Sequence, residues 1–203
     1  MPRPDISDKL VHFTSGANEE QAFANLCSII DEGAIRGSDR MIKSRDRCVC
    51  FTEAPIATLG RGLVNLSEFS KYQPFGVIYD KIHVYGEGGR PVIYQSDEEF
   101  FGLPDQARWR HMRYEPIIVP PAEHITDFTW EREWRVRTDS FTALPYLGGL
   151  VFPSHAWANR LRRRHVEQQN YLVYEYSQIM DATLAEQQLD PFPWRIFVLD
   201  ADI

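Results

Sequence analysis

Two glutamates separated by one residue are the strongest candidates for chemistry in this chain. Glu131 and Glu133 stand in the run WEREWRVR, which leads into a β-prone segment alternating large apolar residues with arginines. In an extended strand, side chains two residues apart lie on one face, so two such carboxylates approach each other and at least one pKa rises. Paired carboxylates suit general base catalysis or the stabilisation of a positively charged transition state. The structural alternative is a solvent-facing edge held by salt bridges to Arg132 and Arg135.

A basic loop precedes another predicted strand, at residues 48–52. Its cationic residues are Arg40, Lys43, Arg45 and Arg47. The planar guanidinium fork matches phosphate oxygens, so this spacing fits a phosphate-binding loop. Asp39 and Asp46 partly neutralise the loop, which leaves a solvated charged surface as an equal alternative.

Two further positions hold side chains that suit ligand contacts. His12 and Thr14 stand at the end of a predicted strand, 10–13, facing the start of a predicted helix, although a histidine at a strand end is usually a structural hydrogen-bonder. Tyr72 stands in an aromatic-rich stretch just before a predicted strand, 75–79. Most such aromatic residues are core, yet a tyrosine in a loop there can stack on a flat heterocycle.

The elements that must position these residues are strands with few helices. Asn18 followed by two glutamates and Gln21 predicts a helix start, and Gly33 predicts its stop, so a helix is expected over 19–32. Another helix is expected from near Ser154. The remaining expected elements are a helix over 177–188 and strands at 90–95, 116–119, 134–137, 149–152 and 195–199, with Val84 and Tyr85 extending the strand at 75–79 beyond a turn. The pattern predicts one α+β domain over residues 1–203.

Composition narrows the class of protein. The chain has 203 residues, 43% of them hydrophobic, and a net charge of −7, which argues against a large non-specific nucleic-acid footprint. We expect no signal peptide, no membrane span and a cytoplasmic location, where three cysteines need not form disulfides. Cys48 and Cys50 lack a second ligand pair at zinc spacing, so no metal is expected. The glycines at 86–89 predict a turn rather than a pyrophosphate loop.

Taken in order, these motifs resemble the ADP-ribosyltransferase superfamily, most closely DarT-like toxins that use NAD to modify nucleic acid. The resemblance rests on His12-Phe13-Thr14, on the following helix with its Asn25-Leu26, and on Ile42-Lys43 with a nearby arginine. It continues in Tyr72-Gln73-Pro74-Phe75, in Arg90-Pro91-Val92-Ile93-Tyr94 and in Glu133-Trp134-Arg135-Val136. The segment 48–55 has no counterpart in this family, and Glu131-Arg132-Glu133 is more similar to the Glu-x-Glu of arginine-modifying transferases. Part of the pattern also resembles bacterial families linked to abortive infection.

The resemblance implies an ADP-ribosyltransferase-like fold with NAD in a cleft between two short sheets. It implies catalytic roles for Glu133, Glu131 and Arg47, and NAD contacts from His12, Thr14, Arg45, Tyr72 and Arg90. Glu133 would stabilise the oxocarbenium-like ribose left when nicotinamide departs, as in glycoside hydrolysis. Arg45 or Arg47 would pair with the pyrophosphate, and Tyr72 would stack on nicotinamide.

The resemblance leaves the acceptor and the partners open. A base in single-stranded DNA or RNA is the first expectation, with arginines near Trp109 or at 160–164 as binding edges. A protein acceptor and hydrolysis of NAD by water are enzymatic alternatives. A non-catalytic nucleotide- or partner-binding module is the alternative outside enzymes. A toxin of this kind also implies an antitoxin protein as partner.

Overall fold

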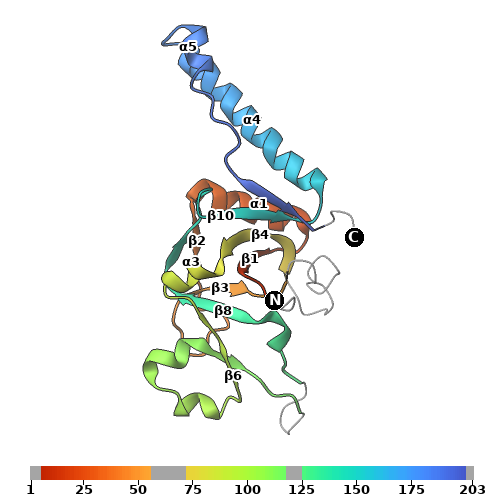
Figure 1. The fold of residues 1–203 in the computed structure, drawn as a ribbon, viewed down its shortest axis with the longest axis vertical. Coiled ribbons are helices and arrows are strands. Elements are labelled where there is room, and N and C mark those ends of the chain that lie inside the picture. Colours follow the sequence, from red (N-terminus) through yellow and green to blue (C-terminus); the bar gives the residue numbers. More distant parts are fainter. Residues whose placement is uncertain (1–5, 56–71, 118–124, 200–203) are drawn as a thin grey trace.

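A seven-stranded mixed sheet lies at the centre of the fold (Figure 1). Together with a few helices it confirms the α+β class predicted from the sequence. The structure is a computed structural model that describes residues 6–55, 72–117 and 125–199. The strand order is β11-β10-β4-β1-β3-β8-β5, and all neighbours are antiparallel except β10 and β11. The strands are β1 (Lys9–Ser15), β3 (Cys48–Thr52), β4 (Tyr72–Asp80), β5 (Arg90–Pro91), β8 (Glu133–Arg137), β10 (Gly148–Phe152) and β11 (Arg195–Val198).

The sheet is weakly joined between β1 and β3. β1 pairs with β4 from Lys9 to Phe13 and, after a shift in register, again at Ser15, but it pairs with β3 only where Val11 faces Thr52. Beyond that pair, Nδ1 of His12 lies 2.8 Å from the carbonyl oxygen of Cys50. The His12 side chain therefore hydrogen-bonds a carbonyl group that would pair with a backbone amide if the two strands continued side by side.

Helix α1 (Glu19–Glu32) has the bounds that its capping residues predict. The Asn18 side chain accepts a hydrogen bond from the Gln21 amide, and Gly33 ends the helix in the left-handed conformation with φ of 65°. Its buried residues, Ala22, Phe23 and Leu26, belong to the main core with residues of β1, β3, β4 and β10. A second core cluster, on the other side of β1, contains Val11, Phe13, Ala54, Ile78 and Val151.

Two small sheets and several 3-10 turns complete the body. β2 (Ala34–Arg36) pairs with β9 (Ser140–Thr142), and β6 (Ile93–Gln95) pairs in parallel with β7 (His111–Arg113). The segment from β6 to β7, with 3-10 turns η2 (Glu99–Gly102) and η3 (Asp105–Arg110), lies beyond β8 at the lower end of Figure 1. A last turn, η4 (Thr129–Glu131), leads into β8.

Several elements differ from the sequence prediction, and the strand expected over 90–95 is divided into β5 and β6, which belong to different sheets. Val84 and Tyr85 lie in the short helix α3 (Lys81–Gly86), in which Val84 is buried and accepts a hydrogen bond from the Gly89 amide. Pro116 and Ile117 lie outside any strand, and the rest of that predicted strand falls outside the described residues. The helix predicted over 177–188 is the shorter α5 (Ala182–Glu186), which begins after Asp181 caps the Thr183 amide.

The helix α4 (His155–Ser177) leaves the body as a long arm (Figure 1). Its base is tied to α1 by ion pairs between Arg160 and Glu20 and between Arg164 and Asp31. Beyond this base, α5 and the returning chain cover one side of the helix, where Gln169 accepts a hydrogen bond from the Asp190 amide. We refer to α4, α5 and the returning segment 187–194 as the arm.

Candidate functional site

The two glutamates do not share a strand, contrary to the sequence prediction. Glu133 is the first residue of β8, whereas Glu131 ends the 3-10 turn η4. Between them, Arg132 takes the left-handed conformation with φ of 45°, which breaks the extended backbone at this point. The two carboxylates are nevertheless close enough for the charge of Glu133 to raise the pKa of Glu131.

Glu133 is buried against an arginine of its own strand. Arg135 Nε donates to one carboxylate oxygen of Glu133 at 2.7 Å, and Nη2 lies 3.3 Å from the other. Nη1 of Arg135 donates to the carbonyl oxygens of Trp109 and His111, at 3.0 and 2.7 Å. Glu133 is 6% exposed and Arg135 is 1% exposed. The salt bridge considered from the sequence therefore exists, but it lies inside the protein rather than at a solvent-facing edge.

The environment of Glu131 favours the protonated carboxyl. Burial is the larger cause and the Glu133 charge the second, and together they raise the pKa of Glu131 to about 7, although Arg135 opposes the shift. One carboxylate of the pair is thus salt-bridged to an arginine, while its neighbour has a pKa of about 7. Two neighbouring carboxyl groups in such different environments suit an acid–base pair.

Two neutral hydroxyl groups fix the backbone around the glutamates. Tyr94 Oη accepts a hydrogen bond from the Glu133 amide at 3.2 Å and donates to the carbonyl of Phe128 at 3.3 Å. Burial raises the pKa of Tyr94 to about 12, so it stays protonated. The Thr52 hydroxyl donates to the Glu131 carbonyl at 2.5 Å. We refer to Glu131, Glu133, Arg135, Tyr94 and Thr52 as the carboxylate cluster.

Sequence reasoning missed the part that Tyr94 plays in this cluster, and it placed the salt bridge to Arg135 at a solvent-facing edge instead of in the interior. Tyr94 is 39 residues from Glu133 in the chain and reaches it because β6 folds back beside β8. A contact between residues so far apart in the chain cannot be predicted from the spacing of residues in a short motif. The signal for Arg135 was its position two residues after Glu133, which places both side chains on one face of β8.

Cys50 shares this face of the sheet, in an environment that disfavours its thiolate. Its partner across the strands is Arg135, and burial followed by the Glu133 charge raises the pKa of the Cys50 thiol well above its usual range. Burial also raises the pKa of Cys48 to about 11. Both cysteines are free thiols, and a thiolate is not available from either of them at neutral pH.

His12 and Thr14 lie on a strand near the carboxylate cluster, but their side chains point into the core and away from the two glutamates. Val11, opposite Thr52, lies on the face of Glu133, so alternation places His12 on the other face, where its ring centroid is 6.0 Å from that of Phe51 in the main core. Burial lowers the pKa of His12, which keeps the ring neutral. The buried Thr14 hydroxyl donates to the carbonyls of Ala22 and Phe75. Both residues connect elements of the core, and the structure does not bring them to the carboxylates.

The basic loop lies at the opposite end of β3 from Glu133. Thr52 is paired with Glu133 and Cys48 with Arg137, so Arg47, which is five residues before Thr52, lies roughly 17 Å from Glu133 along the strand. Its guanidinium donates to the Gly37 carbonyl and lies 3.3 Å from Asp139. Arg45 is exposed, with a left-handed φ of 63°. Arg40 is exposed as well.

The two other predicted NAD contacts lie on strands. Tyr72 is the first residue of β4, paired with Ser15, and not in a preceding loop; its side chain falls outside the described residues. Arg90 pairs with Arg135 across β5 and β8, but its guanidinium donates to the carbonyls of Tyr85 and Gly89 and stacks 4.0 Å from the Tyr85 ring centroid. Arg90 therefore closes the turn after α3.

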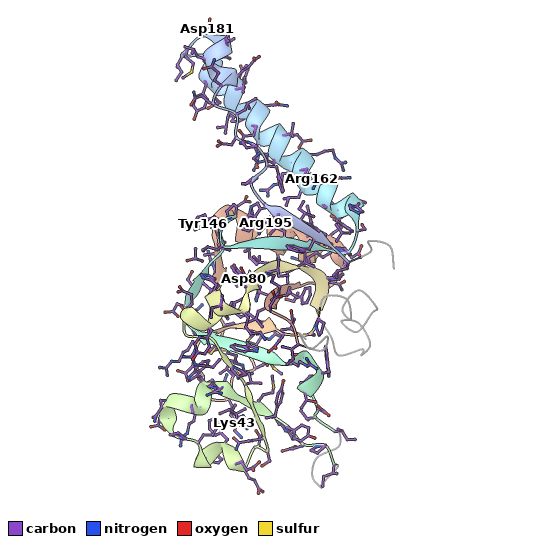
Figure 2. The ribbon with its side chains drawn as sticks, viewed as in Figure 1. Lys43, Asp80, Tyr146, Arg162, Asp181 and Arg195 are labelled. Carbon is purple, nitrogen blue, oxygen red and sulfur yellow. The ribbon has the colours of Figure 1, made fainter. Side chains whose placement is uncertain are left out.

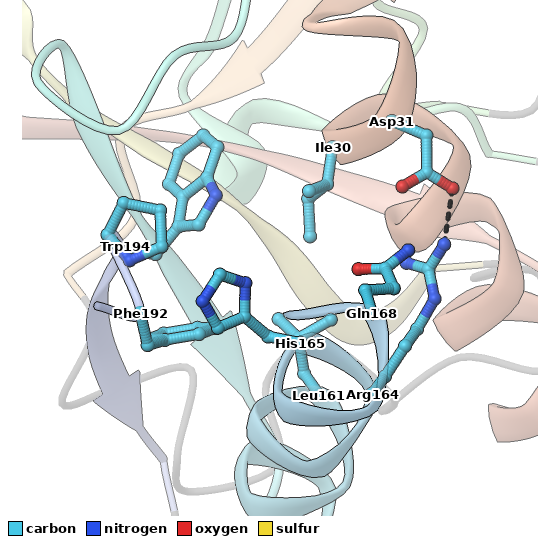
Figure 3. Close-up of a pocket in the computed structure, with 9 residues that line it drawn as sticks. Ile30, Asp31, Leu161, Arg164, His165, Gln168, Phe192 and Trp194 are labelled. Atoms are coloured by element: carbon cyan, nitrogen blue, oxygen red, sulfur yellow. Dashed lines mark hydrogen bonds and ion pairs between the residues drawn. The ribbon is translucent and has the colours of Figure 1, made fainter. Parts of the chain in front are cut away.

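A small cavity of about 90 Å³ lies elsewhere, where α4 meets α1 (Figure 3). Aromatic rings of Phe192 and Trp194 line one side, and the ion pair between Asp31 and Arg164 lies on another. None of the residues predicted to bind NAD lines it.

Within the described residues, no group of three or more His, Cys, Asp or Glu side chains is placed to hold a metal ion. No described helix is long and apolar enough to cross a bilayer. Comparison of the chain with protein-family models, with curated proteins and with solved structures finds no match.

Proposed function

We propose that the chain is an ADP-ribosyltransferase that cleaves NAD at the carboxylate cluster and transfers ADP-ribose to a nucleic-acid base. The observation that carries the proposal is the unequal pair of carboxyl groups. Glu133 is buried in a salt bridge with Arg135, and the pKa of Glu131 rises to about 7. The donor and the acceptor are inferred from the resemblance to DarT-like enzymes.

The chemistry of the donor fits this pair. The bond between C1 of the ribose and the nicotinamide nitrogen breaks, its electron pair leaves on nitrogen, and neutral nicotinamide departs from an oxocarbenium-like ribose. A fixed negative charge near that cation lowers the barrier to its formation. Glu133 supplies the charge, and Arg135 neutralises part of it while holding it in place.

The acceptor must lose a proton when it bonds to C1. A carboxyl group with a pKa of about 7 is partly deprotonated at neutral pH and is strong enough as a base to take that proton. Glu131 is also less buried than Glu133, which makes it the carboxylate that meets the acceptor. In this proposal Glu131 is the general base and Glu133 the electrostatic stabiliser.

The two arginines predicted to contact the pyrophosphate of NAD, Arg45 and Arg47, lie far from the carboxylates. Arg45 is exposed and Arg47 half-exposed, so both can meet a pyrophosphate, but they stand roughly 17 Å or more from the carboxylates along β3. An extended dinucleotide is long enough to reach from one end of a five-residue strand to the other. A proposal that includes either arginine therefore requires NAD to lie along β3 and β8.

Transfer of labelled ADP-ribose tests this function. Wild type, Glu131→Gln, Glu133→Gln and the exposed-surface control Glu87→Gln are incubated with labelled NAD and, separately, with single-stranded DNA, RNA and cell protein. The proposal expects label on DNA or RNA with the wild type and the control, and loss of that label in both site variants. Label on protein alone would show that the acceptor is a protein and not a nucleic acid. Nicotinamide release without label on any polymer would identify a glycohydrolase. A wild type that neither labels a polymer nor releases nicotinamide would leave only a binding module.

A further inference from the structure

The arm carries a helix face that nothing in the described structure covers. The positions on it are spaced as i, i+3, i+4, i+7, i+8 and i+11, which form one stripe of a helix: Arg163, Val166, Glu167, Asn170, Tyr171 and Tyr174. Val166, Tyr171 and Tyr174 are 54%, 61% and 63% exposed. We refer to these six residues as the arm face.

The other side of α4 is already occupied. His165 lies 2.9 Å from the Asp190 carbonyl and its ring contacts Phe192, while Gln169 accepts from the Asp190 amide. The returning chain and α5 therefore pack on one side only. Large apolar side chains left on the opposite side of a projecting helix are typical of a surface that meets a partner.

Charge is separated along the arm. Arg160, Arg162, Arg163 and Arg164 stand in the base, whereas residues 165–194 contain five acidic residues and no lysine or arginine. Figure 2 marks Arg162 near the base and Asp181 at the far end. Arg160 and Arg164 already pair with α1, which leaves Arg162 and Arg163 exposed as the cations of the base.

We propose that two copies of the chain associate through their arm faces, with the two α4 helices antiparallel. In a parallel pair, the arginines of one helix would lie beside the same arginines of the partner helix, and the two acidic halves would lie beside each other. This repulsion between like charges costs free energy. In an antiparallel pair, the basic half of each helix lies along the acidic half of the other. The surface thus fits a second copy of itself, as a twofold interface requires.

The antiparallel register follows from the arm face. With the twofold axis between residues 168 and 169, Arg163 faces the partner's Tyr174 and Val166 faces the partner's Tyr171. The first contact places a guanidinium over an aromatic ring, and the second buries two apolar side chains. Helices of 23 residues are about 35 Å long, which gives the two faces room to overlap along the whole stripe.

Sedimentation velocity from ~1 to ~100 µM tests the proposal. The wild type is expected to sediment at twice the chain mass in the upper part of this range. Tyr171→Gln with Tyr174→Gln should weaken association at least ~100-fold, because both rings are central to the contact. Tyr146→Gln is the matched control, since Tyr146 is 79% exposed on the body and away from the arm (Figure 2).

A charge exchange tests the register. Arg163→Glu alone should weaken association at least ~10-fold, and Arg163→Glu combined with Tyr174→Arg should restore it by forming the opposite charge pair across the axis. Circular dichroism on each variant separates loss of association from loss of the helix. A monomeric wild type throughout the range would overturn the proposal, as would a dimer that survives the double tyrosine substitution.

Discussion

At the scale of single residues, burial and two charges decide what the carboxylate cluster can do. Arg135 gives Glu133 two short contacts, and its other donors are taken by the carbonyls of Trp109 and His111. Burial and the Glu133 charge raise the pKa of Glu131 to about 7, against the opposing charge of Arg135. The same three side chains therefore set both the fixed charge and the titrating group.

The pH dependence of stability should report Glu131. An acid whose folded pKa is raised from 4.5 to about 7 binds more protons in the folded than in the unfolded state between these values, so its contribution to stability falls as pH rises. We expect Glu131→Gln to gain stability relative to wild type between pH 5 and 8, by at most about 3 kcal/mol. Urea unfolding at several pH values measures this. A difference that does not change with pH would contradict the assignment, and Glu87→Gln should show no such trend.

The buried arginine should be far more sensitive than its exposed neighbour. Arg135→Met leaves the Glu133 carboxylate buried without its partner, which should cost about 3–5 kcal/mol, and adding Glu133→Gln should recover part of that loss. Arg137→Met, two residues further along β8 and half-exposed, should cost less than about 0.5 kcal/mol. Denaturant midpoints of the three variants test this order, and equal losses at 135 and 137 would show that the buried pair contributes little.

At the scale of elements, the close approach of β1 and β4 requires a glycine. A Cβ atom at Gly76 would lie 2.3 Å from the His12 carbonyl oxygen, a backbone atom that cannot move without disturbing the strand pairing. Gly86, at the end of α3, has no atom within 4 Å of the corresponding position. Gly76→Ala should therefore cost more than about 2 kcal/mol, whereas Gly86→Ala should be close to neutral. Urea unfolding of both variants compares them directly, and equal midpoints would contradict this packing.

Elements whose ends carry local signals were predictable from the sequence. α1 has the predicted bounds because Asn18 and Gly33 fix its two ends, and β3 has the predicted bounds, Cys48–Thr52. The break between Glu131 and Glu133 was not predictable, because a left-handed arginine has no strong sequence signature. The β propensity of Val84 predicts a strand, but the packing of α3, in which Val84 is buried, overrides that preference.

At the scale of the whole molecule, the fold separates the residues that the sequence motifs suggested as one site. Alternation across β1 directs His12 into the main core, and the length of β3 sets Arg47 apart from Glu133. Contacts that complete the carboxylate cluster come from segments far away in the chain, such as Tyr94 on β6. The pattern of expected strands and helices was enough to predict the α+β class, whereas side-chain direction and strand register needed the three-dimensional structure.

The rate of nicotinamide release from NAD as a function of pH tests the central claim most directly. With single-stranded nucleic acid present, the wild-type rate should rise with the deprotonation of Glu131 and reach half its maximum near pH 7. Glu131→Gln should lose this rise together with most of the rate, while Glu87→Gln should follow the wild type. Absence of nicotinamide release from the folded wild type at every pH, or an unchanged profile in Glu131→Gln, would contradict a catalytic carboxylate cluster.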